Sequence, residues 1–175
     1  MKLRVIAAAA AGCLLLAPIA GAQTPATPPN LDAVPDKMPF DVPYGAPITL
    51  DRAQAVLAAV VAEAKKHDWK MNAAVVDPGG NLIAFARMDG AQIASIAISE
   101  HKARAAASFR RDTKTFETNV QNGVIYQLSL DGMIASRGGI PLVEDGKLIG
   151  AVGVSGGAGS QDEVCAKAGA AVVNK

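Results

Sequence analysis

The sequence predicts one α/β domain of the α+β type, in which helices pack against an antiparallel sheet. The first observation is a pair of short apolar hairpins: residues 71–76 pair with 82–87, and residues 140–143 pair with 148–154. Their connections, Asp77-Pro78-Gly79-Gly80-Asn81 and Glu144-Asp145-Gly146-Lys147, are too short for a parallel crossover. The second observation is a repeat, because each hairpin is followed by a loop and an Ala-rich helix. The domain is therefore expected to be a ββα repeat.

Three longer helices are expected around these hairpins. Thr49 is placed to cap the first helix, whose apolar stripe contains Val56, Leu57, Val60, Val61 and Ala64. The second helix covers residues 93–109, and Asp112 is placed to cap a short helix after it. The last helix covers residues 161–173, where Ser160-Gln161-Asp162-Glu163 has the pattern of a capping box.

The N-terminal region has the pattern of a signal peptide over residues 1–22. Lys2 and Arg4 precede an apolar stretch over residues 5–19, and Ala20-Gly21-Ala22 offers small residues for cleavage. The apolar stretch is shorter than the roughly 20 residues that span a membrane. We therefore expect export to the periplasm or secretion, without a stable membrane anchor.

Residues 23–48 are expected to form a proline-rich arm before the domain, which covers residues 49–175. Seven prolines fix the backbone of this arm in extended, irregular conformations: Pro25, Pro28, Pro29, Pro35, Pro39, Pro43 and Pro47. Phe40, Val42 and Tyr44 alternate with polar residues or proline, so this part is expected to pack on the domain.

Charge and cysteine content restrict the classes of function. Removal of residues 1–22 takes away Lys2 and Arg4, so 15 of the 17 basic residues remain against 16 acidic ones and the net charge falls from +1 to −1. A nearly neutral domain lacks the basic surface expected of a nucleic-acid-binding protein. Cys165 is the single cysteine after cleavage, so it has no intramolecular disulfide partner and is expected to be a buried thiol.

The glycine-rich loop over residues 153–159 does not fit a nucleotide-binding motif. Its spacing differs from Gly-x-Gly-x-x-Gly, and Asp162 and Glu163 in the next helical turn would repel a phosphate. A tight backbone loop beside a pocket or a subunit contact is the favoured interpretation. Because no constellation of nucleophile, base and orienting acid stands out and the two histidines are not spaced for zinc, the sequence favours a binding protein over an enzyme.

Polar side chains concentrate on the expected second helix at Ser99-Glu100-His101-Lys102-Ala103-Arg104. A solvated helix face explains such a cluster equally well. His101, however, shares a face with the small residue Ala105, which leaves room for a flat ligand. His67, the other histidine, is expected only to satisfy carbonyl groups at the end of the first helix.

Several motifs in order resemble the GlcG/HbpS family, which includes haem-binding extracellular proteins and the C-terminal domain of PduO-type proteins. The resemblance covers residues 49–173 and rests on five segments: Asp77-Pro78-Gly79-Gly80-Asn81-Leu82, Arg87-Met88-Asp89-Gly90-Ala91, Ser99-Glu100-His101-Lys102-Ala103, Gly138-Gly139-Ile140-Pro141, and Val154-Ser155-Gly156-Gly157 followed by Gln161-Asp162. It implies a profilin-like domain with an antiparallel sheet, assembly into a homo-oligomer, and haem as a ligand.

The resemblance also implies candidate site residues. The family's Lys-Ala-x-Thr-Ala segment corresponds to residues 102–106, where Ala105 replaces the threonine and removes its hydroxyl. His101 is then the substitute candidate for the axial ligand of the haem iron. Arg87, Lys102 and Arg104 are candidates for pairing with the propionates. Met88 and Met133 are weaker candidates for iron ligation, because methionine more often fills a core.

Three functions remain open from the sequence. The leading hypothesis is an exported haem- or tetrapyrrole-binding protein for storage, sensing or transfer. The second is an accessory enzyme or a small-acid- or corrinoid-binding protein of a catabolic pathway, acting at the glycine-rich loop. The third is a structural oligomer without a ligand.

Overall fold

The computed structural model describes residues 30–174, so the expected signal peptide and the first part of the arm lie outside the described residues. The elements follow the predicted order. They are α1 (Leu50–Lys66), β1 (Asn72–Val76), β2 (Leu82–Arg87), α2 (Ala94–Phe109), α3 (Lys114–Gln121), the 3₁₀ helix η1 (Ile125–Ser129), β3 (Gly139–Glu144), β4 (Lys147–Ser155) and α4 (Gly159–Ala170).

The four strands form one antiparallel sheet in the order β2-β1-β4-β3. The hairpins β1–β2 and β3–β4 therefore meet where β1 pairs with β4. In this pairing Asn72 lies opposite Ser155, and Val76 lies opposite Ala151. The α+β class and the two ββα units expected from the sequence are confirmed.

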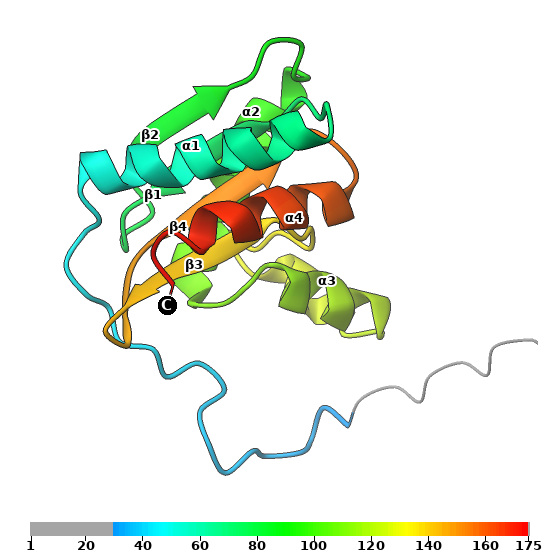
Figure 1. The fold of residues 1–175 in the computed structure, drawn as a ribbon. Helices are drawn as coiled ribbons and strands as arrows, with labels where there is room; N and C mark the ends of the chain where they lie inside the picture. Colours follow the sequence, from blue (N-terminus) through cyan, green and yellow to red (C-terminus); the bar gives the residue numbers. More distant parts are fainter. Residues whose placement is uncertain (1–29, 175) are drawn as a thin grey trace, which may run out of the picture.

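Helices cover both faces of the sheet, which gives three layers (Figure 1). Helices α1 and α4 lie side by side on one face, over a core that includes Val56, Val60, Val75 and Val152. Helix α2 lies alone on the other face, over a smaller cluster built largely of alanine. Cys165 of α4 is buried, as expected, and burial raises the pKa of its thiol to about 11.

The last helix begins earlier than the sequence pattern indicated. Its N-cap is Ala158 and not Ser160, and the side-chain oxygen of Gln161 accepts a hydrogen bond from Ala158 N at 2.8 Å. Ser160 therefore lies inside α4, which ends at Ala170. At the start of α3, Asp112 accepts a backbone hydrogen bond as the sequence predicts: its Oδ1 atom accepts from Lys114 N at 2.8 Å.

The part of the arm before α1 packs on the domain. Leu148 N donates to Pro43 O, and Gly45 N donates to Leu148 O, so the arm pairs with β4 beyond the end of β1. The phenol of Tyr44 donates to Ser108 O at 3.0 Å, at the end of α2. Residues 43–48 therefore act as an added edge of the sheet rather than as a free linker (Figure 1).

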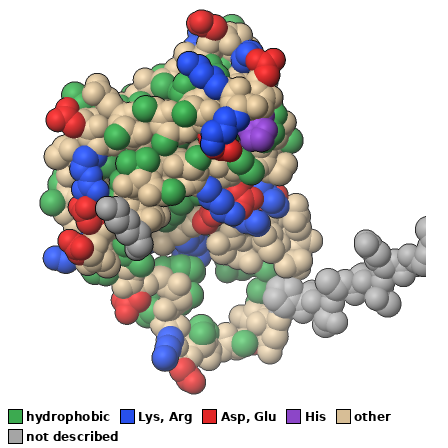
Figure 2. Space-filling view, in the orientation of Figure 1, with side chains coloured by type: hydrophobic (Ala, Val, Ile, Leu, Met, Phe, Trp, Pro, Cys, Tyr) green, Lys and Arg blue, Asp and Glu red, His purple; other side chains and the backbone are tan. Residues whose placement is uncertain are grey.

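Acidic and basic side chains alternate over the face of the molecule seen in Figure 2, which shows no large region of one sign. None of the helices in residues 30–174 combines the length and the apolar character needed to cross a bilayer.

Candidate functional site

Two glycines allow α2 to lie unusually close to the sheet. A Cβ atom built on Gly139 would collide with Lys102 O, and one on Gly153 would collide with Ser99 O and Ala103 N. The backbone of α2 is therefore in direct contact with β3 and β4. Because the sheet fixes the position and rotation of α2 in this way, it also fixes the directions in which the polar side chains of residues 99–104 leave the helix.

His101 leaves α2 at a half-buried position beside the segment that follows η1. Its Nε2 atom lies 3.2 Å from Gly132 O. A carbonyl oxygen only accepts hydrogen bonds, so Nε2 carries a proton, and in the neutral imidazole Nδ1 then presents its lone pair. Nδ1 has no hydrogen-bond partner among residues 30–174. The imidazole is thus oriented by one nitrogen and available through the other.

Exposed apolar side chains gather on the segment that contacts His101. In and after η1 these are Ile125, Tyr126, Leu128 and Leu130. Gly132, which faces His101, follows two residues later. His101 therefore contacts a segment whose preceding residues expose apolar side chains.

Arg104 lies one helical turn beyond His101 and is exposed. Its guanidinium pairs with Glu100 at 2.7 Å, and its stem packs against Gly80 in the β1–β2 turn. Arg87 is also exposed, but it pairs with Asn72 at the opposite end of β2. Five residues of strand, about 16 Å at 3.3 Å per residue, separate that end from the turn. The structure therefore does not bring Arg87 to the side of Arg104.

The two methionines lie in different places. Met88 packs against the core beneath α1 and α4, on the face of the sheet opposite to α2. Met133 is buried and follows Gly132, so its segment lies against His101. Of the two, only Met133 belongs to the neighbourhood of the imidazole.

Lys102 does not lie where it could pair with a propionate, the role that the sequence predicts, because its side chain points into the protein. Only 1% of the residue is exposed. The ammonium donates to Asp162 Oδ2 at 2.7 Å and to Val154 O at 3.2 Å. Asp162 Oδ1 in turn accepts from Gly157 N at 3.1 Å. Lys102 thus joins α2, the end of β4 and the start of α4 from the inside.

Glu163, the neighbour of Asp162, is the centre of a second charged group. It is 5% exposed and pairs with Lys114, Arg137 and Lys167, at 3.0, 3.3 and 2.6 Å. Arg137 also pairs with Glu117 of α3 at 2.7 Å. These contacts attach α3 and the segment before β3 to the first turn of α4. Burial acts to raise the pKa of Glu163, but hydrogen bonds from Lys167 and Lys114 outweigh it and lower the pKa below its usual value.

Glu163→Gln is expected to lower the free energy of unfolding at pH 7 by about 1–3 kcal/mol, because it removes the charge from these hydrogen bonds. The lowered pKa means that the wild-type advantage is present above the unfolded-state pKa, near 4.5, and is lost as the pH falls through the folded-state value. Urea unfolding at pH 7 and at about pH 4 measures both effects. Glu100→Gln, at an exposed pair, is the control and should cost less. An equal loss from Glu163→Gln at both pH values would contradict the assignment.

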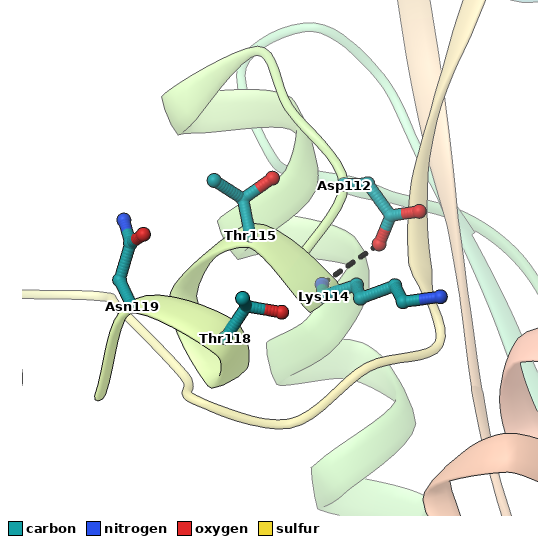
Figure 3. A pocket seen from close by; sticks show the side chains of 5 residues that line it. All are labelled: Asp112, Lys114, Thr115, Thr118 and Asn119. Carbon is teal, nitrogen blue, oxygen red and sulfur yellow. Dashed lines mark hydrogen bonds between the residues drawn. The ribbon is translucent and has the colours of Figure 1, made fainter. Parts of the chain in front are cut away.

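A shallow pocket of about 300 Å³ opens beside this charged group, at the start of α3 (Figure 3). It is lined by Asp112, Lys114, Thr115, Thr118 and Asn119. Burial raises the pKa of the Asp112 carboxyl, and Glu163 adds to the rise. A second pocket of about 650 Å³ lies between the start of α1, the β3–β4 turn and the C-terminal residues. None of the site residues expected from the sequence lines either pocket.

Sequence reasoning missed the structural roles of Asp162, Glu163, Arg137 and Lys114. The available signal is a pair of acids in the first helical turn after the glycine-rich loop, which the sequence analysis interprets as part of a capping box and as a feature that repels phosphate. The cations that pair with them lie 26 to 60 residues away, apart from Lys167. His67 is the C-cap of α1, where its backbone N–H donates to Ala64 O as expected at a helix end, and its ring stacks on Trp69 and faces Glu63.

The fold is an α+β domain whose central helix presents one histidine oriented by a hydrogen bond to Gly132 O. A family model described as "Haem degrading protein HbpS-like" matches residues 48–171. The chain belongs to this HbpS-like family.

Individual relatives agree with this assignment. Protein GlcG of Escherichia coli K12 is 46% identical over 103 residues, which cover 59% of this chain and 77% of GlcG. A double mutant of Streptomyces reticuli HbpS is 28% identical with a TM-score of 0.69, over 84% of this chain and 100% of that one. A crystal structure of a PduOC–haem complex is 26% identical with a TM-score of 0.67, over 74% of this chain and 96% of that one.

Proposed function

We propose that this protein is an exported, homo-oligomeric haem-binding protein that stores, senses or transfers haem, with His101 as an iron ligand. The hydrogen bond between His101 Nε2 and Gly132 O carries the proposal. Histidines that bind metals almost always donate their second ring nitrogen to a carbonyl or carboxylate, which fixes the tautomer and the orientation of the ring. The family assignment and the relative whose structure contains haem support the choice of ligand.

The surroundings of His101 fit a flat apolar macrocycle. The exposed side chains of Ile125, Tyr126, Leu128 and Leu130 offer apolar surface on which the faces of a porphyrin gain free energy by leaving water. Arg104, one turn along α2, is the nearest candidate for a propionate, and would exchange its exposed partner Glu100 for the new one. We assign no haem contact to Lys102, whose ammonium is enclosed, or to Arg87 and Met88, which lie elsewhere on the sheet.

The glycine-rich loop offers less to a ligand. Gly157 N already donates to Asp162 Oδ1, and Asp162 already pairs with Lys102. The backbone N–H of Gly157 and the carboxylate of Asp162, which an enzyme would use there, are therefore already hydrogen-bonded to each other. This observation favours haem binding over an accessory enzyme that acts at the loop.

Titration of the protein with haemin, followed by the Soret absorbance, tests the proposal. Wild-type protein is expected to give a saturable, red-shifted band, and His101→Ala is expected to weaken haemin binding at least tenfold because the axial nitrogen is lost. His67→Ala is the matched control, since it removes the other histidine, which stacks on Trp69 at the surface. The proposal fails if His101→Ala and His67→Ala leave the same spectrum and affinity as the wild type.

A further inference from the structure

Arg111, two residues after the end of α2, packs among aromatic rings. Its guanidinium lies directly over the ring of Phe40, with Phe116 and Phe109 at 5.1 and 5.9 Å from the ring centroids. Phe40 belongs to the arm, so the arm supplies one wall of this cage. Burial and the neighbouring charge of Arg110 lower the pKa of Arg111 to about 10, and the group remains protonated at neutral pH.

Within residues 30–174, Arg111 has no carboxylate partner. Its Nε donates to Phe109 O at 3.1 Å, while its two terminal nitrogens donate to no group in that part of the chain. Asp112, the nearest acid in sequence, is turned toward the pocket of α3, where it accepts the hydrogen bond of Lys114 N (Figure 3). Arg110 adds a second positive charge, and it is itself held by Val42 O and the ring of Tyr44.

Arg111 is half-buried, and a guanidinium that is partly removed from water is commonly paired with an acid. Phe40 lies against the guanidinium, and the two terminal nitrogens have no acceptor among residues 30–174. The edge that carries these nitrogens is a planar fork that matches the two oxygens of a carboxylate. The partner that is missing from the described chain is therefore an acceptor that arrives in the plane of the guanidinium.

We propose that Arg111 anchors a binding site for a small carboxylate attached to an apolar ring. The walls formed by Phe40, Phe109 and Phe116 favour an apolar body over a polar one. A phosphate is disfavoured, because it needs several donors and Arg110 is already engaged.

The site is separate from the proposed haem site. His101 precedes the end of α2 at Phe109 by eight residues, about 12 Å along the helix at 1.5 Å per residue. Failure of haem binding therefore does not decide whether Arg111 binds a carboxylate, and the reverse also holds.

Arginine-selective ¹⁵N spectra of the full chain, titrated with sodium benzoate, test the inference. The Nε–H signal of Arg111 is protected by its hydrogen bond to Phe109 O and reports on the guanidinium. Benzoate is expected to shift this signal saturably at about millimolar concentration, as is typical of so small a ligand. Benzamide, which has the same shape without the charge, and inorganic phosphate are each expected to bind at least tenfold more weakly.

Variants separate binding from folding. Arg111→Lys keeps the charge but loses the fork, so at least a tenfold loss of benzoate affinity is expected, with the circular dichroism spectrum unchanged. Saturation-transfer signals of benzoate itself, which do not depend on an Arg111 resonance, compare this variant with the wild type. Arg104→Gln and His101→Ala should bind benzoate as the wild type does. The inference is overturned if benzoate does not shift the signal, if Arg111→Lys binds it equally well, or if benzamide or phosphate matches it.

Discussion

Lys102→Met is expected to lower the free energy of unfolding by about 3–5 kcal/mol. The substitution keeps most of the volume of the side chain and removes its ammonium, which leaves the carboxylate of Asp162 charged and only 2% exposed. Val154 O also loses a hydrogen-bond donor in the interior. Both losses fall on groups that water does not reach, so little of the interaction is recovered. Urea unfolding at pH 7, followed by circular dichroism, measures the change.

Two further variants show whether burial is the cause. Arg104→Met breaks an ion pair of the same kind on the exposed face of the same helix, and a loss below about 1 kcal/mol is expected. The double variant Lys102→Met with Asp162→Leu removes both charges, and it is expected to be more stable than Lys102→Met alone. If Lys102→Met and Arg104→Met cost the same, the buried pair does not hold α2 to α4 in the way described here.

Lys102 also shows which structural features the local sequence does not predict. Local patterns determined the hairpins, because the alternation of apolar residues and turn residues acts within a few positions, and the strands lie within one residue of their expected ends. The burial of Lys102 depends on Asp162, which is 60 residues away. A lysine in a helix is normally solvated. The sequence places Lys102 beside a small and apolar stripe, four residues from Ile98 and from Ala106, but it does not indicate the acid that would pair with a buried ammonium.

For the candidate haem site, too, the sequence predicts the local features and not the contacts between distant segments. The sequence placed His101 on the central helix beside small residues, and the structure shows it half-buried on α2. Its contact with Gly132 was not foreseen, because the segment between α3 and β3 has no periodic pattern that fixes its path. The expected grouping with Arg87 and Met88 required the register of β2, which places both away from His101.

Gly153→Ala is expected to lower the free energy of unfolding by about 3 kcal/mol, at the upper end of the usual cost of overpacking. The added Cβ meets Ser99 O and Ala103 N, which are backbone atoms of α2 and have no rotamer to change. The helix must therefore move away from β4 as a unit. Such a movement opens the packing of Ala103 against the sheet and strains the bond between Lys102 and Val154 O. Thermal and urea unfolding measure the loss.

Gly146→Ala is the matched control, because glycine is required there for a different reason. Gly146 has a φ of +72° in the β3–β4 turn, and an added Cβ would have nothing within 4 Å. Alanine is therefore expected to lower the free energy of unfolding only through its strained backbone conformation, by about 1–2 kcal/mol. The two variants also differ in their expected effect on function. His101 lies between Ser99 and Ala103, so displacement of α2 by Gly153→Ala should weaken haemin binding under the proposed function, whereas Gly146→Ala should leave it unchanged. If Gly153→Ala is as stable as Gly146→Ala and binds haemin normally, close contact with β4 is not what sets the position of the histidine.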